Sequence, residues 1–473
     1  MALRDSRTVR GWVGTLAVCG SILAGSVLIS RAGPLDPPAG PVSPTYRTLS
    51  EVEPRIPIGP STTPGDADSV YKITQPGTYY LTENLTGKSG KHGIEIAASY
   101  VTIDLRGFNL VGVAGSLDAL SGVNVTALTI GNGVIRSWPG RGIGMPTASS
   151  STFHHLDVFD CAGFGIDVGV RCRVEACNCR NGSEGVRSGD ECTISSCTVV
   201  SCSGTGLIGG KGSEIRGCSV SFPGSYGIYG GIGSRVIDCS VRSGTSTGII
   251  VSDSSIVRGC TSVGNGSGIS LFGIGSKAED CTANQNQYEG ITTSLYVGGF
   301  VISHCAASSN GTYGIVGNSS DITGCSAGGN GVDGIVANGG SVTDCTSTGN
   351  TQAGIRGADA MISRCSADSN TLDGFVVSSY CTIESCHADL NGLDAGIGAG
   401  ILATGIGNRI ENNQVVRNDY GLHITGDNNV IIRNTARGNT TNYSIIAGNE
   451  NAAVLTNPGA NFTSTNPWAN IAF

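Results

Sequence analysis

The sequence predicts an all-β solenoid, a single coil of about 16 turns built from very short strands. The first observation is that cysteines recur roughly every 20 residues from Cys177 to Cys386. The second is that glycine followed by an apolar residue keeps the same spacing from Gly165 to Gly421. The third is that asparagine joins the pattern from Asn265 onward. A repeat this short cannot bury an apolar face alone, so successive repeats must stack.

Each element of the repeat has a physical reason. The stretch "ITGCSAGGNGVDGIV" shows one unit, with Ile three residues before Cys and with Asn and Gly after it. Apolar runs of two to four residues bounded by turn formers are typical of short strands, and they carry no helical stripe of apolar residues. Asn and Gly tolerate left-handed backbone angles at corners. Cysteine is small and apolar enough for a crowded interior corner.

The pattern has two irregular ends. After Cys386, asparagine takes the place of cysteine at Asn413 and Asn434. At the N-terminal end, we expect Gly93, Gly122 and Gly142 to continue the column of repeat glycines as three further turns; the regular part of that column is Gly165, Gly185, Gly206, Gly227, Gly248, Gly268, Gly290, Gly314, Gly334, Gly354, Gly374, Gly400 and Gly421.

The unit Ile-x-x-Cys/Asn-x-Ala/Val-x-x-Asn-x-x-x-Gly-Ile resembles the repeat of right-handed parallel β-helix proteins, the pectate-lyase-like superfamily. The resemblance extends from about Tyr71 to Ala447. It implies one right-handed parallel β-helix. It does not single out an activity, because the superfamily includes lyases, hydrolases, epimerases, maturation factors and adhesins.

Composition divides the rest of the chain. Residues 1–32 combine a positively charged start with the apolar run "GWVGTLAVCGSILAGSVLIS", which predicts a signal peptide, or a membrane anchor if it stays uncleaved. Residues 33–68 are rich in proline and predict a semi-rigid linker. The coil is expected over 69–456 and a C-terminal cap over 457–473. We therefore expect an exported protein, located outside the cell, in the periplasm or at the cell surface.

The cysteines are expected to be a buried column of thiols. The chain has 18 cysteines, and removal of Cys19 with the leader leaves an odd number, which cannot all pair within one chain. Cys172 and Cys192 occupy one column on adjacent turns and are the candidates for a disulfide. No C-x-x-C pair occurs in the dense patch from Cys161 to Cys202, so no metal site is predicted there.

Stacking allows a search for catalytic residues column by column. Asp167 with Arg187, and Asp280 with His304, fall in shared columns on adjacent turns and are the candidates for acid–base chemistry. The non-catalytic alternative for Asp167 with Arg187 is a surface salt bridge, and for Asp280 with His304 it is a solvated polar edge. The columns searched hold no two carboxylates on adjacent turns beside a base.

One further column holds acidic residues that do not lie on consecutive turns. Glu289, Asp333 and Asp373 share the position before the repeat glycine and are candidates for weak cation binding, with Ca²⁺ as the ion. No cofactor is otherwise predicted.

Three functions remain open. We favour a non-catalytic exported protein that binds surface polysaccharide or a cell-surface protein. The alternative is a polysaccharide lyase, a glycoside hydrolase or an epimerase, and the second alternative is a periplasmic maturation factor similar to the β-helix proteins that assist copper enzymes. A formal charge of −8 gives no basic surface for nucleic acid, and a membrane is a partner only if residues 1–32 stay attached.

Overall fold

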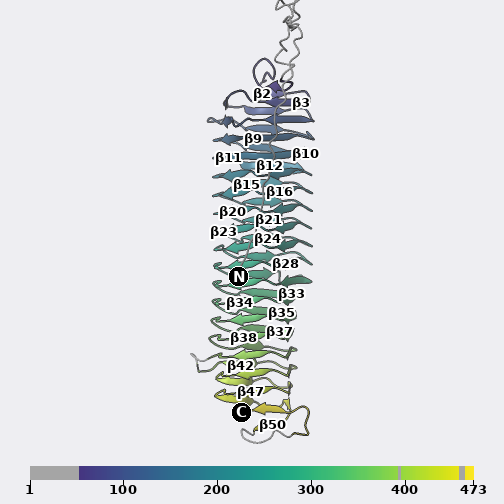
Figure 1. Cartoon of the computed structure of the whole chain (residues 1–473), viewed down its shortest axis with the longest axis vertical. Helices are drawn as coiled ribbons and strands as arrows, with labels where there is room; N and C mark the ends of the chain where they lie inside the picture. Colours follow the sequence, from purple (N-terminus) through teal and green to yellow (C-terminus); the bar gives the residue numbers. More distant parts are fainter. Residues whose placement is uncertain (1–52, 393–395, 457–463) are drawn as a thin grey trace, which may run out of the picture. The chain divides into compact units, whose positions relative to one another are not determined.

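The computed structural model describes residues 53–392, 396–456 and 464–473. The expected signal peptide or anchor at 1–32, and residues 33–52 of the expected linker, lie outside the described residues. One compact unit extends from Pro54 to Phe473. Its strands follow one another in sequence order along the axis of a long coil (Figure 1).

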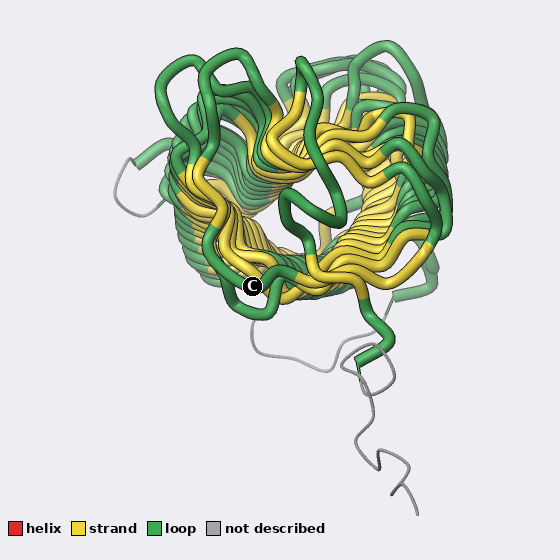
Figure 2. The backbone as a smooth tube through the Cα atoms, turned by 90° about the horizontal axis from the view of Figure 1, so that it is seen from above, coloured by secondary structure: helices red, strands yellow, loops and turns green. Residues whose placement is uncertain are grey.

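The unit is an all-β parallel solenoid of about 19 turns, which confirms the predicted fold class and is close to the predicted number of turns. Every pairing between named strands is parallel, and the described residues contain no helix. Consequently, no helix in the described part of the chain is long and apolar enough to span a bilayer. Seen along its axis, the coil encloses a narrow interior between stacked strands (Figure 2).

Three stacks of parallel strands form the walls of the coil. The first stack is β2 (Ser69–Ile73), β5 (His92–Ile96), β8 (Leu120–Gly122), β10 (Ile143–Ser149), β12 (Phe164–Val170), β15 (Glu184–Ser188), β18 (Leu207–Gly209), β21 (Ile228–Gly230), β24 (Ile249–Val251), β27 (Ile269–Leu271), β30 (Ile291–Thr293), β33 (Ile315–Thr323), β35 (Ile335–Thr343), β37 (Ile355–Ser363), β39 (Phe375–Val377), β42 (Ala399–Ala403), β45 (Tyr420–Ile424) and β48 (Thr441–Ile445).

The second stack shares the long strands β33, β35 and β37 with the first. Its other members are β1 (Ile56–Pro57), β3 (Gly77–Tyr80), β6 (Val101–Asp104), β9 (Thr129–Arg136), β11 (Thr152–Phe159), β13 (Arg173–Glu175), β16 (Thr193–Ser195), β19 (Glu214–Arg216), β22 (Arg235–Ile237), β25 (Ile256–Arg258), β28 (Lys277–Glu279), β31 (Phe300–Ser303), β40 (Thr382–Glu384), β43 (Arg409–Glu411), β46 (Val430–Ile432) and β49 (Glu450–Asn451).

The third stack shares β9 and β11 with the second. Its other members are β4 (Leu85–Thr86), β7 (Asn109–Val111), β14 (Asn178–Arg180), β17 (Thr198–Val200), β20 (Ser219–Ser221), β23 (Ser240–Arg242), β26 (Thr261–Val263), β29 (Thr282–Asn284), β32 (Ala306–Ser308), β34 (Ser326–Gly328), β36 (Thr346–Thr348), β38 (Ser366–Asp368), β41 (His387–Asp389), β44 (Gln414–Val416), β47 (Thr435–Arg437), β50 (Val454–Thr456) and β51 (Asn470–Ala472).

Repeat glycines stack as predicted from Gly165 to Gly421, because the apolar residues that follow them pair in register. A Cβ atom at Gly314 would lie 2.5 Å from the carbonyl oxygen of Gly334 on the next turn, so a side chain does not fit in this column. One N-terminal turn departs from the prediction. Leu120 pairs with both Ile94 and Ile143, which places Ala119, and not Gly122, in the glycine column.

The cysteine column is buried, as expected. Every cysteine from Cys161 to Cys386 is a free, buried thiol. Each thiol faces backbone atoms of neighbouring turns: the amide of Cys239 donates to Cys260 Sγ at 3.4 Å, and Cys239 Sγ lies 3.5 Å from the carbonyl oxygen of Ile215. Cys386 donates its amide to Asn413 Oδ1 at 2.9 Å, which confirms that asparagine continues this column.

A second column consists of asparagine side chains that join successive turns. The amide and Nδ2 of Asn330 both donate to Asn350 Oδ1, at 3.0 and 2.9 Å, and Asn350 Nδ2 donates to Asn370 Oδ1 at 2.9 Å. The same contact continues along the described asparagines Asn265, Asn286, Asn310, Asn330, Asn350, Asn370, Asn391, Asn418 and Asn439. This ladder satisfies buried corner amides that no strand partner reaches.

Both ends of the coil extend beyond its expected limits. Within the expected linker 33–68, β1 pairs with β3, so residues 56–57 already form part of the second stack. Within the expected cap 457–473, β51 pairs with β47 and β50 and adds a strand to the third stack. Trp468 and Phe473 lie half-exposed against Arg433 and Arg437 respectively.

Slow thiol labelling is expected for the native coil. Burial raises the pKa of the Cys161 and Cys202 thiols to about 11, because a thiolate is poorly solvated there. A thiol reagent should therefore modify few cysteines before denaturation and all of them after it, as counted by mass spectrometry. Rapid modification of the cysteines from Cys218 to Cys365 in the native protein would show that this column faces water.

Replacement of one ladder asparagine should weaken the coil. Asn350→Ala leaves the backbone amide of Asn330 and one of the two N–H groups of its Nδ2 without an acceptor in a dry interior, which should cost about 3 kcal/mol of unfolding free energy. Thr348→Ala, at an exposed position on the same turn, is the control and should change the free energy of unfolding by less than about 0.5 kcal/mol. Equal denaturation midpoints for the two variants would rule out a stabilising role for the ladder.

Candidate functional site

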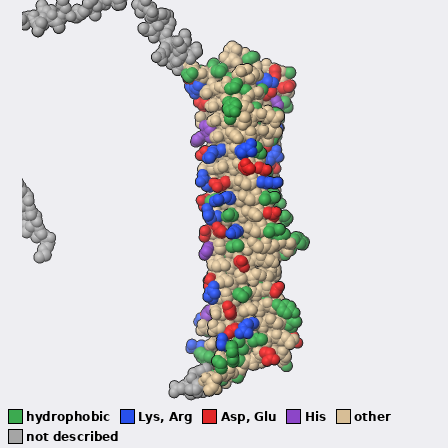
Figure 3. Space-filling view, turned by 90° about the vertical axis from the view of Figure 1, so that its right-hand side faces the viewer, with side chains coloured by type: hydrophobic (Ala, Val, Ile, Leu, Met, Phe, Trp, Pro, Cys, Tyr) green, Lys and Arg blue, Asp and Glu red, His purple; other side chains and the backbone are tan. Residues whose placement is uncertain are grey.

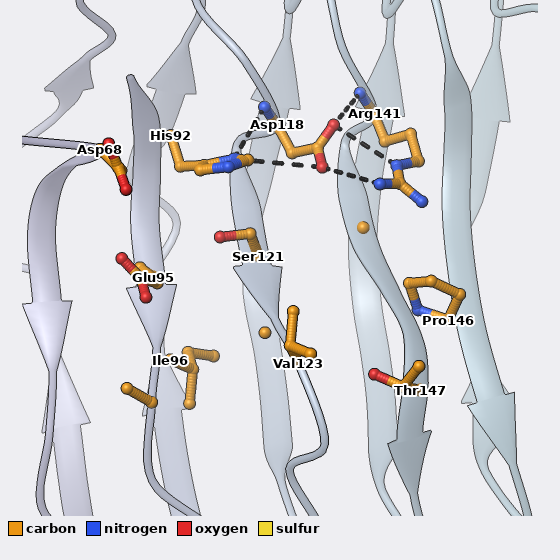
Figure 4. Close-up of a pocket in the computed structure, with 13 residues that line it drawn as sticks. Asp68, His92, Glu95, Ile96, Asp118, Ser121, Val123, Arg141, Pro146 and Thr147 are labelled. Carbon is orange, nitrogen blue, oxygen red and sulfur yellow. Dashed lines mark hydrogen bonds and ion pairs between the residues drawn. The ribbon is translucent and has the colours of Figure 1, made fainter. Parts of the chain in front are cut away.

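Three ionisable side chains stack on successive turns beside the first strand stack. Gly93 donates its amide to the carbonyl oxygen of Asp118, and Ala119 donates to that of Arg141. His92, Asp118 and Arg141 therefore occupy one column, at the position before the repeat glycine. Figure 4 shows their side chains pointing toward one another across three neighbouring strands.

An ion pair fixes the centre of this group. Asp118 Oδ1 accepts the backbone amide of Arg141 at 2.7 Å, and Asp118 Oδ2 lies 3.2 Å from Arg141 Nη2. A Cβ atom at residue 144 would collide with Asp118 Oδ2, so glycine at this position in β10 makes room for the carboxylate. The ion pair thus lies directly over the backbone of the sheet.

The same guanidinium links a second carboxylate. Arg141 Nη1 lies 2.8 Å from Asp167 Oδ2, and Asp167 also accepts two hydrogen bonds from Arg187, at 2.8 and 2.7 Å. The Asp167 side chain is only 1 % exposed, so it is a buried anion between two arginines. Hydrogen bonding to Asp167 raises the pKa of Arg187, whose guanidinium also lies 4.0 Å from the Phe164 ring centroid.

The tautomer of His92 follows from its backbone partner. The amide of Asp118 lies 3.2 Å from His92 Nδ1 and can only donate, so Nδ1 accepts. This contact leaves Nε2 as the ring nitrogen that presents a hydrogen-bond donor.

These residues border an open pocket of about 430 Å³ over β5, β8 and β10. Its polar lining includes Asp68, Glu95, Ser121 and Thr147, and Figure 4 shows Asp68 and Glu95 on the side away from Arg141. Glu95 Oε1 forms an ion pair with Lys72 Nζ at 2.8 Å. The pocket therefore combines fixed charges with unpaired acceptors.

Glu184 stacks on Phe164, in the same column as His92 but two turns further along than Arg141. Burial raises the pKa of Glu184, and its Oε2 is buried without a hydrogen-bond partner. In the outward column of the same stack, Ile208, Tyr229 and Ile250 follow Arg187 on later turns. Charged groups therefore pause after Arg187 in this stack and return at Glu289, Asp333, Arg356 and Asp373 on later turns.

The face in Figure 3 carries interspersed positive and negative side chains, more of them over its upper, N-terminal half. Such mixing of both signs means that most surface charges have an opposite neighbour. The strip from His92 to Arg187, made of His92, Asp118, Arg141, Asp167 and Arg187, differs because two arginines share the buried carboxylate of Asp167 beside an open pocket.

The structure brings one predicted pair together and leaves the other apart. Asp167 and Arg187 meet in an ion pair whose carboxylate is buried while the arginine stays 41 % exposed, so the expected surface pair is half-buried. Asp280 and His304 occupy left-handed corners with φ of 54° and 52°, and both are exposed. Among the described contacts, no hydrogen bond joins them, so they do not form an acid–base pair.

The three acidic residues that were candidates for cation binding each have a different partner. Asp333 is paired with Arg356 at 2.7 Å, and Glu289 accepts a hydrogen bond from Ser267 at 3.0 Å. Asp373 accepts the amide of Ala399 at 2.8 Å, and burial raises its pKa. The described residues contain no group of three His, Cys, Asp or Glu side chains that could hold a metal ion.

The disulfide candidates are free thiols in this structure. The amide of Cys172 donates to Cys192 Sγ at 3.2 Å, and Cys192 Sγ lies 3.1 Å from the carbonyl oxygen of Gly169. Cys172 Sγ likewise lies 3.8 Å from the carbonyl oxygen of Ala148, and the two thiols are also within side-chain hydrogen-bonding reach of each other.

Sequence reasoning did not single out His92, Glu95, Asp118 and Arg141, and register explains only Asp118, because Gly93 and Gly142 were assigned correctly. It assigned Gly122 to the glycine column, whereas Ala119 occupies that column, so Asp118 was never aligned with its neighbours. The alignment of "HGIEI", "DALSG" and "RGIGM" would have revealed them. Glu95 and Asp118 lie on adjacent turns but in different columns, outside the columns searched, and Asp118 lies 4.0 Å from the imidazole.

Comparisons with known proteins agree with the architecture. Residues 206–351 and 316–440 match a family model described as "Right handed beta helix region". Similar solved structures include the A-module of the mannuronan C-5 epimerase AlgE6 from Azotobacter vinelandii, with 14% identity, a TM-score of 0.32, and coverage of 84% of this chain and 89% of that one.

Two further solved structures are of similar rank. The catalytic domain of a GH87 α-1,3-glucanase has 12% identity and a TM-score of 0.37, covering 62% of this chain and 61% of that one. The periplasmic alginate epimerase AlgG has 12% identity and a TM-score of 0.28, and the match covers 79% of this chain and 78% of that one. No curated protein sequence matches. From its stacked parallel strands and the family match, the chain belongs to the right-handed parallel β-helix proteins.

Proposed function

We propose that this protein binds a polysaccharide in the pocket over β5, β8 and β10. The observation that carries the proposal is the strip from His92 to Arg187, a prearranged set of charges beside an open pocket in an otherwise regular coil. An exported protein, as residues 1–32 predict, would meet such a polymer outside the cytoplasm.

Preorganisation supports binding at this place. Asp118 and Asp167 each hold Arg141, and Asp167 also holds Arg187, so these side chains need not be ordered when a ligand arrives. Binding sites whose groups are already fixed lose less conformational entropy on association. The rigid sheet beneath them adds to this advantage, because strands hold side chains more firmly than loops do.

The free hydrogen-bonding groups also suit a sugar. His92 Nε2–H is a donor directed away from the backbone contact of its ring, while Glu95 Oε2 and the Asp68 carboxylate have no partner among the described contacts. Ser121 adds a hydroxyl that can donate or accept. A chain of sugar hydroxyls needs both kinds of partner at short intervals.

Binding should depend on the pocket and not on exposed groups elsewhere. In a panel of soluble polysaccharides measured by calorimetry, His92→Gln and Glu95→Gln should each weaken binding about tenfold, equivalent to ~1.4 kcal/mol. The same substitutions at the exposed corner His304 and at Glu279 in β28 are controls and should leave the affinity unchanged. A wild-type protein that binds no member of the panel would contradict the proposal.

A second candidate function is cleavage or epimerisation of the bound polymer. It is favoured by Glu95 and Asp118, two carboxylates on adjacent turns that line the pocket, of which Asp118 lies 4.0 Å from His92 Nδ1. Asp118 is held by Arg141, so Glu95, with one free oxygen, is the group that could move a proton, and His92 could only orient the sugar.

The second candidate function predicts that one substitution lowers the rate of product formation much more than it lowers the affinity for the polymer. Glu95→Gln keeps the size of the side chain but removes the base, so product formation should fall by at least about 100-fold. Its effect on affinity should stay near tenfold. New reducing ends, unsaturated ends or changed sugar configuration would report the reaction, and bound polymer that yields none of these would eliminate this second candidate.

A further inference from the structure

We infer that the pocket recognises its glycan through hydrogen-bond donors, hydroxyl or ammonium groups, and discriminates against polymers of uronic acids. The inference rests on the proposed function and narrows it to a class of substrate. It follows from the sign, pairing and position of the charges that surround the pocket.

The lining carries an excess of negative charge. Asp68, Glu95 and Asp118 are three carboxylates against the single guanidinium of Arg141, a difference of −2. Asp118 is paired with Arg141 and Glu95 with Lys72, while the Asp68 carboxylate has no cation partner among the described contacts. A polyanion that enters this space meets repulsion from these carboxylates.

The nearby cations are already occupied. Arg141 is shared between Asp118 and Asp167, and both hydrogen bonds of Arg187 toward the sheet end on Asp167. Recognition of a uronate carboxylate favours a guanidinium that can offer two parallel N–H groups. A uronate would have to displace the buried Asp167, which would leave that anion unpaired in a dry environment.

Two described lysines beside the pocket are also engaged, and of these Lys91 donates from Nζ to the carbonyl oxygens of Asp66 and Ser69. Lys72 lies 2.8 Å from Glu95 Oε1 and 2.7 Å from Asp66 Oδ2. Its ammonium therefore bridges two carboxylates at the edge of the pocket. No cation that lines the pocket in the described part of the chain lacks a carboxylate partner.

The acceptors, in contrast, are free. The Asp68 carboxylate and Glu95 Oε2 have no hydrogen-bond donor among the described contacts, and Figure 4 shows both residues on the side of the pocket away from Arg141. Ionised carboxylates only accept hydrogen bonds. Their natural partners on a sugar are hydroxyl groups or the ammonium group of an amino sugar.

Matched polymers test this inference. Polygalacturonate is compared with its full methyl ester, and hyaluronate with its methyl ester, so that each pair differs only in charge. If a pair binds at all, the affinity of its neutral methyl ester at low salt should be at least tenfold higher than that of the acid. Tighter binding of the acids, weakened by added salt, would overturn the inference while leaving the proposed function intact.

A comparison of chitosan with its N-acetylated form, at equal chain length, distinguishes recognition of ammonium groups from recognition of hydroxyl groups. Preference for chitosan that declines with salt indicates ammonium recognition, whereas equal affinities that do not respond to salt indicate hydroxyl recognition; both outcomes support the inference. Failure of every polymer in both tests to bind would remove the proposed function and this inference together.

A variant connects the selectivity to the two free carboxylates. Asp68→Asn with Glu95→Gln lowers the negative charge of the pocket without changing side-chain size, so the preference for ester over acid should shrink about tenfold. The matched control is Asp280→Asn with Glu279→Gln, outside the pocket, which should keep the full preference. An unchanged preference in the pocket variant would contradict the role assigned to Asp68 and Glu95.

Discussion

The parallel hydrogen bonding of each turn to the next determines everything else in this molecule. Equivalent residues on neighbouring turns lie about 4.8 Å apart, so a side chain meets its counterparts above and below before it meets anything else. A column is therefore the unit of both stability and function. Thiols and amides fill the columns of the interior corners. On the outer face, the same rule places His92, Asp118 and Arg141 against one another, although more than 20 residues of chain separate each from the next.

Much of this arrangement could be predicted from the sequence, because a strict period leaves few choices. The spacing of cysteine, asparagine and glycine was enough to predict a stacked all-β coil, the burial of the thiols and the register from Gly165 to Gly421. The prediction was weaker where the period breaks. Ala119 replaces a glycine in a longer turn, and a shift of three residues there hid Asp118. Pairings such as Arg141 with Asp167 cross from one column to another, and a search within single columns does not find them.

The site shows how a regular scaffold accepts an irregular function. Buried ion pairs contribute little net stability, since desolvation offsets most of the attraction. Asp167 and its two arginines are thus poorly explained as a stabilising device in a coil already held by strand pairing. They are better explained as a rigid border for the pocket, in which Gly144 gives the Asp118 carboxylate room to lie over the backbone. The free groups, Glu95 and Asp68, then face a ligand from fixed positions.

The parallel stacking also determines how this architecture can change over generations. Each turn contacts only its two neighbours, so a duplicated or deleted turn of about 20 residues leaves the remaining contacts in place. The asparagine ladder makes such a change inexpensive, because any ladder asparagine can donate to any other across the new junction. Insertions that are not a whole turn would instead move every following column to another face. Selection can therefore adjust the length of the molecule freely beyond the pocket, while the turns from β5 to β15 must keep their spacing.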